Sequence, residues 1–223
     1  MIERHNYTNT TTWIFSLCAC LLLAGIASAQ FHRAEQDRKI TYWLLDPSTH
    51  RFLISHDLTI DKVGQKYAHS FVRKGSVVNP DSKMYDVDTG VQLKTYVVSG
   101  KDVNAEGYYH EHYDDDTVVV QADLDRTIGE GQSVRVRVVE TYTDPVGYTV
   151  KDGELIWTRT IGRPLNYITL PEGWMLESLN SPAVITLDEK GRVLMRFTNP
   201  SNGDLNVTIK ARKREAAAAK PTI

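Results

Sequence analysis

Apolar and polar side chains alternate with a period of two along most of the chain beyond residue 40, the pattern of strands with one buried face. In the segment 134–138, three valines alternate with Arg135 and Arg137, which predicts an antiparallel strand with one solvated face. The other alternating segments are 52–60, 84–87, 91–98, 118–124, 155–160, 166–170, 184–187, 193–198 and 205–211. No segment repeats its apolar residues at the helical spacing of ~3.6. The sequence therefore predicts an all-β fold, an antiparallel β-sandwich of about a dozen short strands.

The turns between these segments predict one sandwich domain over residues 40–212. A polar lead, 30–39, precedes it, and a flexible tail, 213–223, follows it with four consecutive alanines, too few for a stable isolated helix. A proline and a glycine mark a candidate seam near 143–152, where the domain would divide into two sandwiches. We expect one sandwich, because a linker between independent halves is longer and more polar than this seam.

The N-terminal segment has the organisation of a secretory signal peptide. A polar start is followed by an apolar run, 13–27, and by a small-x-small cleavage site at 27–29. An uncleaved membrane anchor is the alternative, but the run is shorter than the ~20 residues that span a bilayer. A lipoprotein signal at Cys20 is a second alternative, although the apolar segment continues past it. We therefore predict that residues 1–29 are removed and that the protein is periplasmic or secreted.

Composition excludes several classes of site from the mature chain. Both cysteines, Cys18 and Cys20, lie in the predicted signal peptide, so disulfides, thiol nucleophiles and thiolate metal sites are absent beyond it. The chain has 26 basic and 28 acidic residues, whereas nucleic-acid-binding proteins usually carry a basic excess. We expect no nucleic-acid partner and no transmembrane segment in the mature chain.

The densest polar cluster lies in residues 108–116 and offers a candidate metal site. His110 and His112 are two residues apart and would share one face of a strand, as two zinc ligands require. Asp114 or Asp116 supplies a third ligand, and the aspartates alone suit calcium. The alternative is a polar loop with aromatic residues that leads into the strand 117–124. No known metal motif has this spacing.

No local motif identifies a catalytic residue. His56 lies in register with Phe52 and Ile54, which favours a hydrogen-bonded histidine at the edge of the core over a catalyst. No nucleophile elbow or phosphate-binding loop occurs. A carboxylate pair for glycoside hydrolysis leaves no local signature, so that alternative stays open. We predict no catalytic residues and no cofactor, apart from a divalent metal if the site at residues 108–116 exists.

Aromatic residues suggest a second kind of site. Trp43, Trp157 and Trp174, with the tyrosines, would form a platform that stacks on sugar rings. The alternative is that they fill the core of the sandwich, as aromatic residues commonly do.

Two groups of segments resemble known proteins. The segments 170–174, 181–183, 191–193, 197–200 and 205–212 resemble those of secreted bacterial β-sandwich proteins of uncharacterised function. The segment 46–52, with the strand after it, resembles the opening of the non-catalytic N-terminal sandwich domain of M1 and M61 metallopeptidases. The zinc-binding helix of those peptidases is absent from the sequence. The resemblance implies an accessory sandwich, and it carries no catalytic residue over to this chain.

The sequence as a whole favours an exported, non-catalytic binding or accessory protein of the bacterial envelope or extracellular space. Its predicted partner is a protein, with a glycan as the second choice. The alternatives are a metal-dependent hydrolase that uses His110, His112 and an aspartate, a carbohydrate-binding module, and a structural component of a larger assembly.

Overall fold

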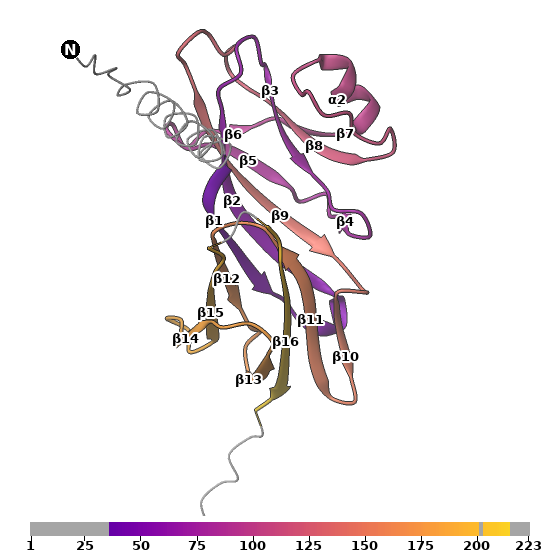
Figure 1. The fold of residues 1–223 in the computed structure, drawn as a ribbon, viewed down its shortest axis with the longest axis vertical. Helices are drawn as coiled ribbons and strands as arrows, with labels where there is room; N and C mark the ends of the chain where they lie inside the picture. Colours follow the sequence, from indigo (N-terminus) through magenta and orange to yellow (C-terminus); the bar gives the residue numbers. More distant parts are fainter. Residues whose placement is uncertain (1–35, 201–202, 215–223) are drawn as a thin grey trace, which may run out of the picture. The chain divides into compact units, whose positions relative to one another are not determined.

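The computed structural model describes residues 36–200 and 203–214. Within them, sixteen strands, the helix α2 (Gly100–Glu106) and the short 3-10 helix η1 (Pro47–Thr49) form the fold shown in Figure 1. The all-β prediction is confirmed. The predicted signal peptide, 1–29, and most of the predicted tail, 215–223, lie outside the described residues, whereas β1 begins at Gln36, inside the predicted polar lead.

The strands form three sheets. The nine-stranded sheet has the order β14 (Val184–Leu187), β15 (Val193–Thr198), β12 (Leu165–Thr169), β1 (Gln36–Leu44), β2 (Arg51–Ile60), β9 (Val134–Thr143), β5 (Lys83–Asp86), β6 (Gln92–Leu93), with β4 (Val77–Val78) also paired to β9. The four-stranded sheet has the order β10 (Tyr148–Lys151), β11 (Glu154–Ile161), β16 (Leu205–Lys213), β13 (Trp174–Leu179). The three-stranded sheet has the order β3 (Tyr67–Phe71), β8 (Val118–Asp123), β7 (Thr95–Ser99).

The period-two pattern gives the nine-stranded sheet two different faces. In β9, Val134, Val136 and Val138 are buried, whereas Arg135 and Arg137 are exposed. Paired residues of neighbouring strands point to the same side of a sheet, so the strand register extends each face across the sheet. We call the side of Val136 the inner face and the side of Arg137 the outer face.

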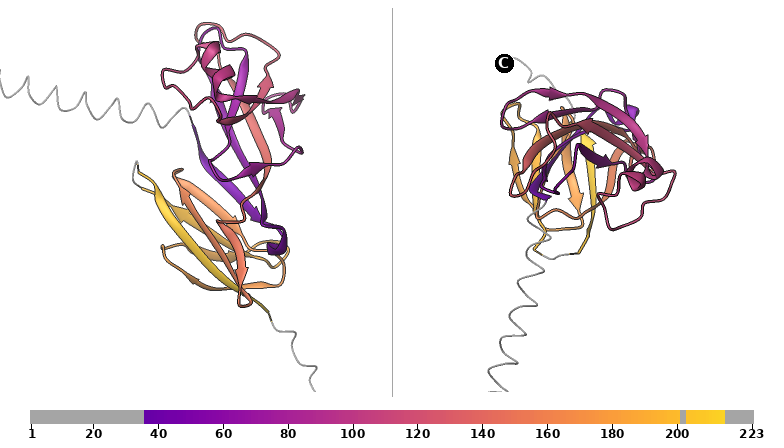
Figure 2. Two further views of the ribbon diagram at one scale, coloured as in Figure 1. Left: turned by 90° about the vertical axis from the view of Figure 1, so that its right-hand side faces the viewer. Right: turned by 90° about the horizontal axis from the view of Figure 1, so that it is seen from above.

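Both smaller sheets pack on the inner face. Phe52 of β2 meets Trp157 of the four-stranded sheet, with ring centroids 6.2 Å apart. Ser70 of the three-stranded sheet donates a hydrogen bond of 3.1 Å to Glu140 of β9. One cluster of buried apolar side chains includes residues of all three sheets. Figures 1 and 2 show the four-stranded sheet near one end of the long strands β2 and β9 and the three-stranded sheet near the other. The fold is a sandwich with one large layer and one divided layer.

Three details of the predicted sandwich differ. The structure has sixteen strands, more than the predicted dozen, and the predicted strand at 91–98 is two strands, β6 and β7, in different sheets. The pair of β1 and β12 is parallel, with Lys39 opposite Leu165, whereas an antiparallel sandwich was expected. Parallel neighbours are far apart in sequence and leave no hairpin signal.

Helix α2 was not expected, because its seven residues are too few to show helical periodicity. Local capping explains why it forms. The Ser99 side chain accepts a hydrogen bond from the backbone N–H of Asp102, and the Asp102 carboxylate accepts one from the Ser99 backbone. Gly107 ends the helix with a φ of 74°, which glycine adopts without strain. Within residues 36–200 and 203–214, no helix combines the length and the apolar character needed to cross a membrane.

Candidate functional site

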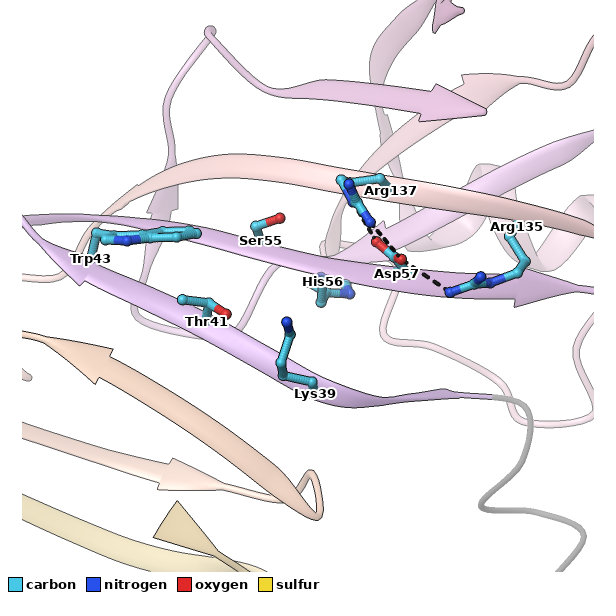
Figure 3. A pocket seen from close by; sticks show the side chains of 8 residues that line it. All are labelled: Lys39, Thr41, Trp43, Ser55, His56, Asp57, Arg135 and Arg137. Atoms are coloured by element: carbon cyan, nitrogen blue, oxygen red, sulfur yellow. Dashed lines mark hydrogen bonds and ion pairs between the residues drawn. The ribbon is translucent and has the colours of Figure 1, made fainter. Parts of the chain in front are cut away.

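A pocket of about 440 Å³ opens on the outer face of the nine-stranded sheet, where β1, β2 and β9 lie side by side. Figure 3 shows the eight residues that line it, which are Lys39, Thr41, Trp43, Ser55, His56, Asp57, Arg135 and Arg137. Alternate residues of β1 and β9, with Ser55 and Asp57 of β2, form this lining because the strand pleat sends alternate side chains outward, and the intervening His56 also borders it. Three of the lining side chains are cationic and one is a carboxylate, so the pocket carries net positive charge in a chain whose formal net charge is −2.

Asp57 holds the two arginines of the pocket in place. Its carboxylate accepts hydrogen bonds from Arg137 Nε at 2.8 Å and Arg137 Nη2 at 3.0 Å. A third bond of 3.2 Å comes from Arg135 Nη2. Asp57 is 6% exposed, whereas the side chains of Arg135 and Arg137 are about half exposed. The two half-exposed arginines therefore cover the buried carboxylate.

Two opposing effects set the pKa of Asp57. Burial raises it, but the hydrogen bond from Arg137 and the charges of Arg137 and Arg135 outweigh burial, so the pKa lies below its ordinary value. Asp57 is therefore ionised at neutral pH and keeps both guanidinium groups oriented.

Cationic and aromatic side chains continue along the outer face on both sides of the pocket. On β5, Lys83 is exposed and lies opposite Val139, two residues beyond Arg137 on β9. On the other side, the ring of Tyr167 lies 5.5 Å from Lys39 Nζ and 5.6 Å from the guanidinium carbon of Arg196. Cations at this distance from a ring face are attracted by the π-electrons. The outer face thus gathers basic groups from four strands, β15, β1, β9 and β5, and the ring of Tyr167 on β12 lies between the cations of β15 and β1.

His56 lies beneath this face as a neutral side chain. Its Nδ1 lies 3.1 Å from Nη2 of Arg163, which is a donor only, so Nδ1 accepts and carries no proton. Burial, with the positive charge of Arg163, lowers the pKa of His56 to about 3. The prediction of a hydrogen-bonded histidine at the edge of the core is confirmed.

A second polar cluster is buried between the three-stranded sheet and α2. His69 of β3 has no exposed side-chain surface, and its Nε2 lies 3.1 Å from Glu106 Oε2 of α2. Its Nδ1 is hydrogen-bonded to the Tyr109 hydroxyl at 3.1 Å. Burial lowers the pKa of His69 to about 4 and raises the pKa of Glu106, so both groups are pushed toward their neutral forms. The cluster joins α2 and the loop at residues 108–116 to the sheet.

The structure places the predicted metal ligands on a loop, not on a strand. His110, His112, Asp114 and Asp116 are all exposed, between α2 and β8. His112 Nε2 lies 3.4 Å from Asn104 Nδ2. Within the described ranges, no three histidine, cysteine, aspartate or glutamate side chains are grouped closely enough to hold one metal ion. The alternative, a polar loop leading into the next strand, describes this segment. The metal site stays a prediction, to be measured as zinc bound per full-length chain.

The three tryptophans considered for a sugar-binding platform do not share one surface. Trp157 is fully buried and Trp174 is 8% exposed, so both fill the core as the alternative predicted. Of these three tryptophans, Trp43 is the partly exposed one, in the outer-face pocket.

The pocket as a whole was not predicted, although the sequence places Arg135 and Arg137 on the solvated side of their strand. The other lining residues come from β1 and β2. Which of them lie beside the arginines depends on the strand register, which places Asp57 opposite Arg137. One feature of the sequence could have indicated the pocket. Asp57 lies at an outward position of the strand 52–60, where two outward arginines on a neighbouring strand would neutralise its charge.

Comparison with known proteins gives a weak likeness in fold. No family model and no curated protein matches the sequence. Among solved structures, the chain is similar to an M1 zinc metallopeptidase from Deinococcus radiodurans, with 11% sequence identity and a TM-score of 0.43, over 77% of this chain and 41% of that one. It is also similar to an aminopeptidase N family protein from Idiomarina loihiensis, with 10% identity and a TM-score of 0.41, over 77% of this chain and 29% of that one.

The chain thus spans less than half the length of the peptidases it matches. These neighbours are M1 peptidase structures at low identity, from one of the families that the segment 46–52 resembles. No activity is carried over from those proteins to this chain.

Proposed function

We propose that the protein is a non-catalytic accessory protein, exported to the bacterial envelope or the extracellular space, that binds a protein partner through the outer face of its nine-stranded sheet. The observation that carries the proposal is the outer-face pocket, where Lys39, Arg135 and Arg137 surround a single carboxylate. Charged groups on a rigid sheet need no reordering on binding, which lowers the entropic cost of association.

The segregation of charge supports this use of the outer face. The formal net charge of the chain is −2, yet the pocket and its surroundings are basic. Charge concentrated on one face orients an approaching partner and raises the rate of association.

Site-specific crosslinking tests the proposal. A photoreactive amino acid replaces Thr41 at the pocket in the full-length chain, and a control chain carries it at Lys151, an exposed position of the four-stranded sheet. We expect the Thr41 chain to form one defined protein adduct in envelope or culture-medium fractions, and the Lys151 chain not to form it. The absence of an adduct, or identical adducts from both positions, would contradict the proposal.

Export is tested separately. Cell fractionation, with N-terminal sequencing of the recovered protein, is expected to find a chain that begins at Gln30 outside the cytoplasm. An intact N-terminus in the cytoplasmic fraction would rule export out without affecting the binding surface.

A further inference from the structure

Three cationic positions on the outer face form a row with the spacing of an extended peptide. Arg135 and Arg137 are two residues apart on β9, and Lys83 of β5 lies opposite Val139, the next outward position of β9. Outward positions along a strand repeat about every 6.6 Å, because each residue rises ~3.3 Å. Alternate side chains of an extended peptide laid along β9 repeat at the same distance, so they would meet Arg135 and Arg137 in turn and would then reach the long side chain of Lys83, one strand spacing of ~4.8 Å to the side.

The chemistry of the row suits carboxylates. A guanidinium has five N–H donors in a planar fork that matches a carboxylate. Arg135 gives Asp57 one hydrogen bond, of 3.2 Å, and its side chain is half exposed. The hydroxyls of Thr41 and Ser55 and the ring of Trp43 complete the pocket, with small polar groups and one apolar wall.

We infer that this row binds an extended acidic segment of the partner protein, one with aspartate or glutamate at alternate positions. The inference rests on the proposed function and names the chemistry of the partner. A peptide is favoured over a polyanion such as a nucleic acid or an anionic membrane, because the chain carries more acidic than basic residues overall and the carboxylate of Asp57 lies among the cations of the pocket.

Binding of fluorescent peptides to the full-length protein, followed by anisotropy, tests the inference. The probe alternates glutamate and threonine, and a second peptide of the same composition has its glutamates in one block. We expect the alternating peptide to bind about ten-fold more tightly than the block peptide, and a glutamine-for-glutamate version not to bind.

A pair of matched variants then locates the binding site. Lys83→Gln/Arg135→Gln is expected to weaken binding of the alternating peptide about ten-fold or more. Lys101→Gln/Lys190→Gln removes the same charge from exposed positions elsewhere and is expected to leave binding unchanged. Circular dichroism is the control that checks whether both variants are folded.

Three outcomes would overturn the inference. These are equal affinity for the alternating and block peptides, equal loss of binding in both variants, and tighter binding of heparin or of phosphatidylglycerol vesicles than of the alternating peptide. If Thr41 crosslinks a protein partner while any of these is observed, the acidic-segment inference fails and the proposed function stands.

Discussion

Asp57 of β2 and Arg137 of β9 stand directly opposite each other in an antiparallel pair, and two hydrogen bonds of 2.8 Å and 3.0 Å join them. This bidentate contact fixes the guanidinium plane of Arg137, and Arg135 adds a third bond to the same carboxylate. A buried aspartate thus orients two half-exposed cations on the outer face. The arrangement links the stability of the sheet to the geometry of the candidate binding surface.

Replacing the carboxylate tests that link. Asp57→Asn removes the charge that both arginines share and leaves an amide that accepts fewer hydrogen bonds. We expect the free energy of unfolding at neutral pH to fall by about 1–3 kcal/mol, measured by urea denaturation. Asp61→Asn, at an exposed position, is the control and is expected to change stability little. Equal effects of the two substitutions would contradict the role assigned to Asp57.

The same variant has a predicted pH dependence. Because the pKa of Asp57 is lower in the folded chain than its ordinary value of about 4, ionised Asp57 stabilises the fold above that value. The stabilisation disappears as the pH falls through the lowered pKa of the folded chain. The stability difference between the wild type and Asp57→Asn is therefore expected to be constant above about pH 5 and to shrink below about pH 4. A stability difference between the two chains that grows as the pH falls would contradict the lowered pKa of Asp57.

The strands could be predicted from the sequence because their signal is local. The alternation at 52–60 and 134–138 gives both the strands and the side that each residue faces, and β14 and β15 have the predicted bounds. The meeting of Asp57 with Arg137 needs the register of two strands eighty residues apart in the chain, and no local pattern encodes it. The contact of His69 with Glu106 likewise depends on a short helix whose only signal is its capping residues.

The buried His69 is expected to make the fold less stable in mild acid. Its pKa is lowered to about 4 by burial, whereas the unfolded chain takes up this proton near pH 6.5, so stability falls as the pH drops between these values. Glu106 acts in the opposite sense, because its raised pKa lets the folded chain take up a proton more readily than the unfolded one.

Two variants separate these contributions. His69→Gln is expected to flatten the loss of stability between about pH 6.5 and pH 4, and Glu106→Gln to steepen it, because it removes the opposing group. The measurement is the urea midpoint as a function of pH. Identical pH profiles for the wild type and His69→Gln would show that His69 is not held neutral in the fold.

We expect that any side chain at Gly100, at the start of α2, lowers the stability of the fold. A Cβ at this position would collide with the backbone oxygen of Asp114, and it would lie 3.1 Å from the Thr117 Cβ. The Gly100 N–H also donates a hydrogen bond of 2.7 Å to the Thr117 oxygen, so the collision would disturb the contact between helix and loop. We expect Gly100→Ala to lower stability by about 1–3 kcal/mol.

The matched control is Gly129→Ala, where the new Cβ would meet only the end of the Gln132 side chain, at 2.9 Å. Because that side chain can rotate away, a smaller loss is expected. Near-ultraviolet circular dichroism should also change in Gly100→Ala, because Tyr113 of the displaced loop stacks on Phe71 with centroids 4.1 Å apart. Equal melting temperatures for the two variants would contradict the steric argument.

Glu140 connects the three-stranded sheet to β9, and burying its carboxylate there costs free energy. It is 1% exposed, and its Oε2 accepts hydrogen bonds from Ser70 at 3.1 Å and Tyr142 at 2.7 Å. Burial raises its pKa, and the two hydrogen bonds oppose that rise only in part. A neutral side chain of the same shape keeps an acceptor for both hydroxyls and avoids burying a charge. We therefore expect Glu140→Gln to be neutral or stabilising at pH 7 and Glu140→Ala to lower stability by about 2–4 kcal/mol, measured by urea denaturation. A large loss in Glu140→Gln would show instead that the buried negative charge itself stabilises the junction.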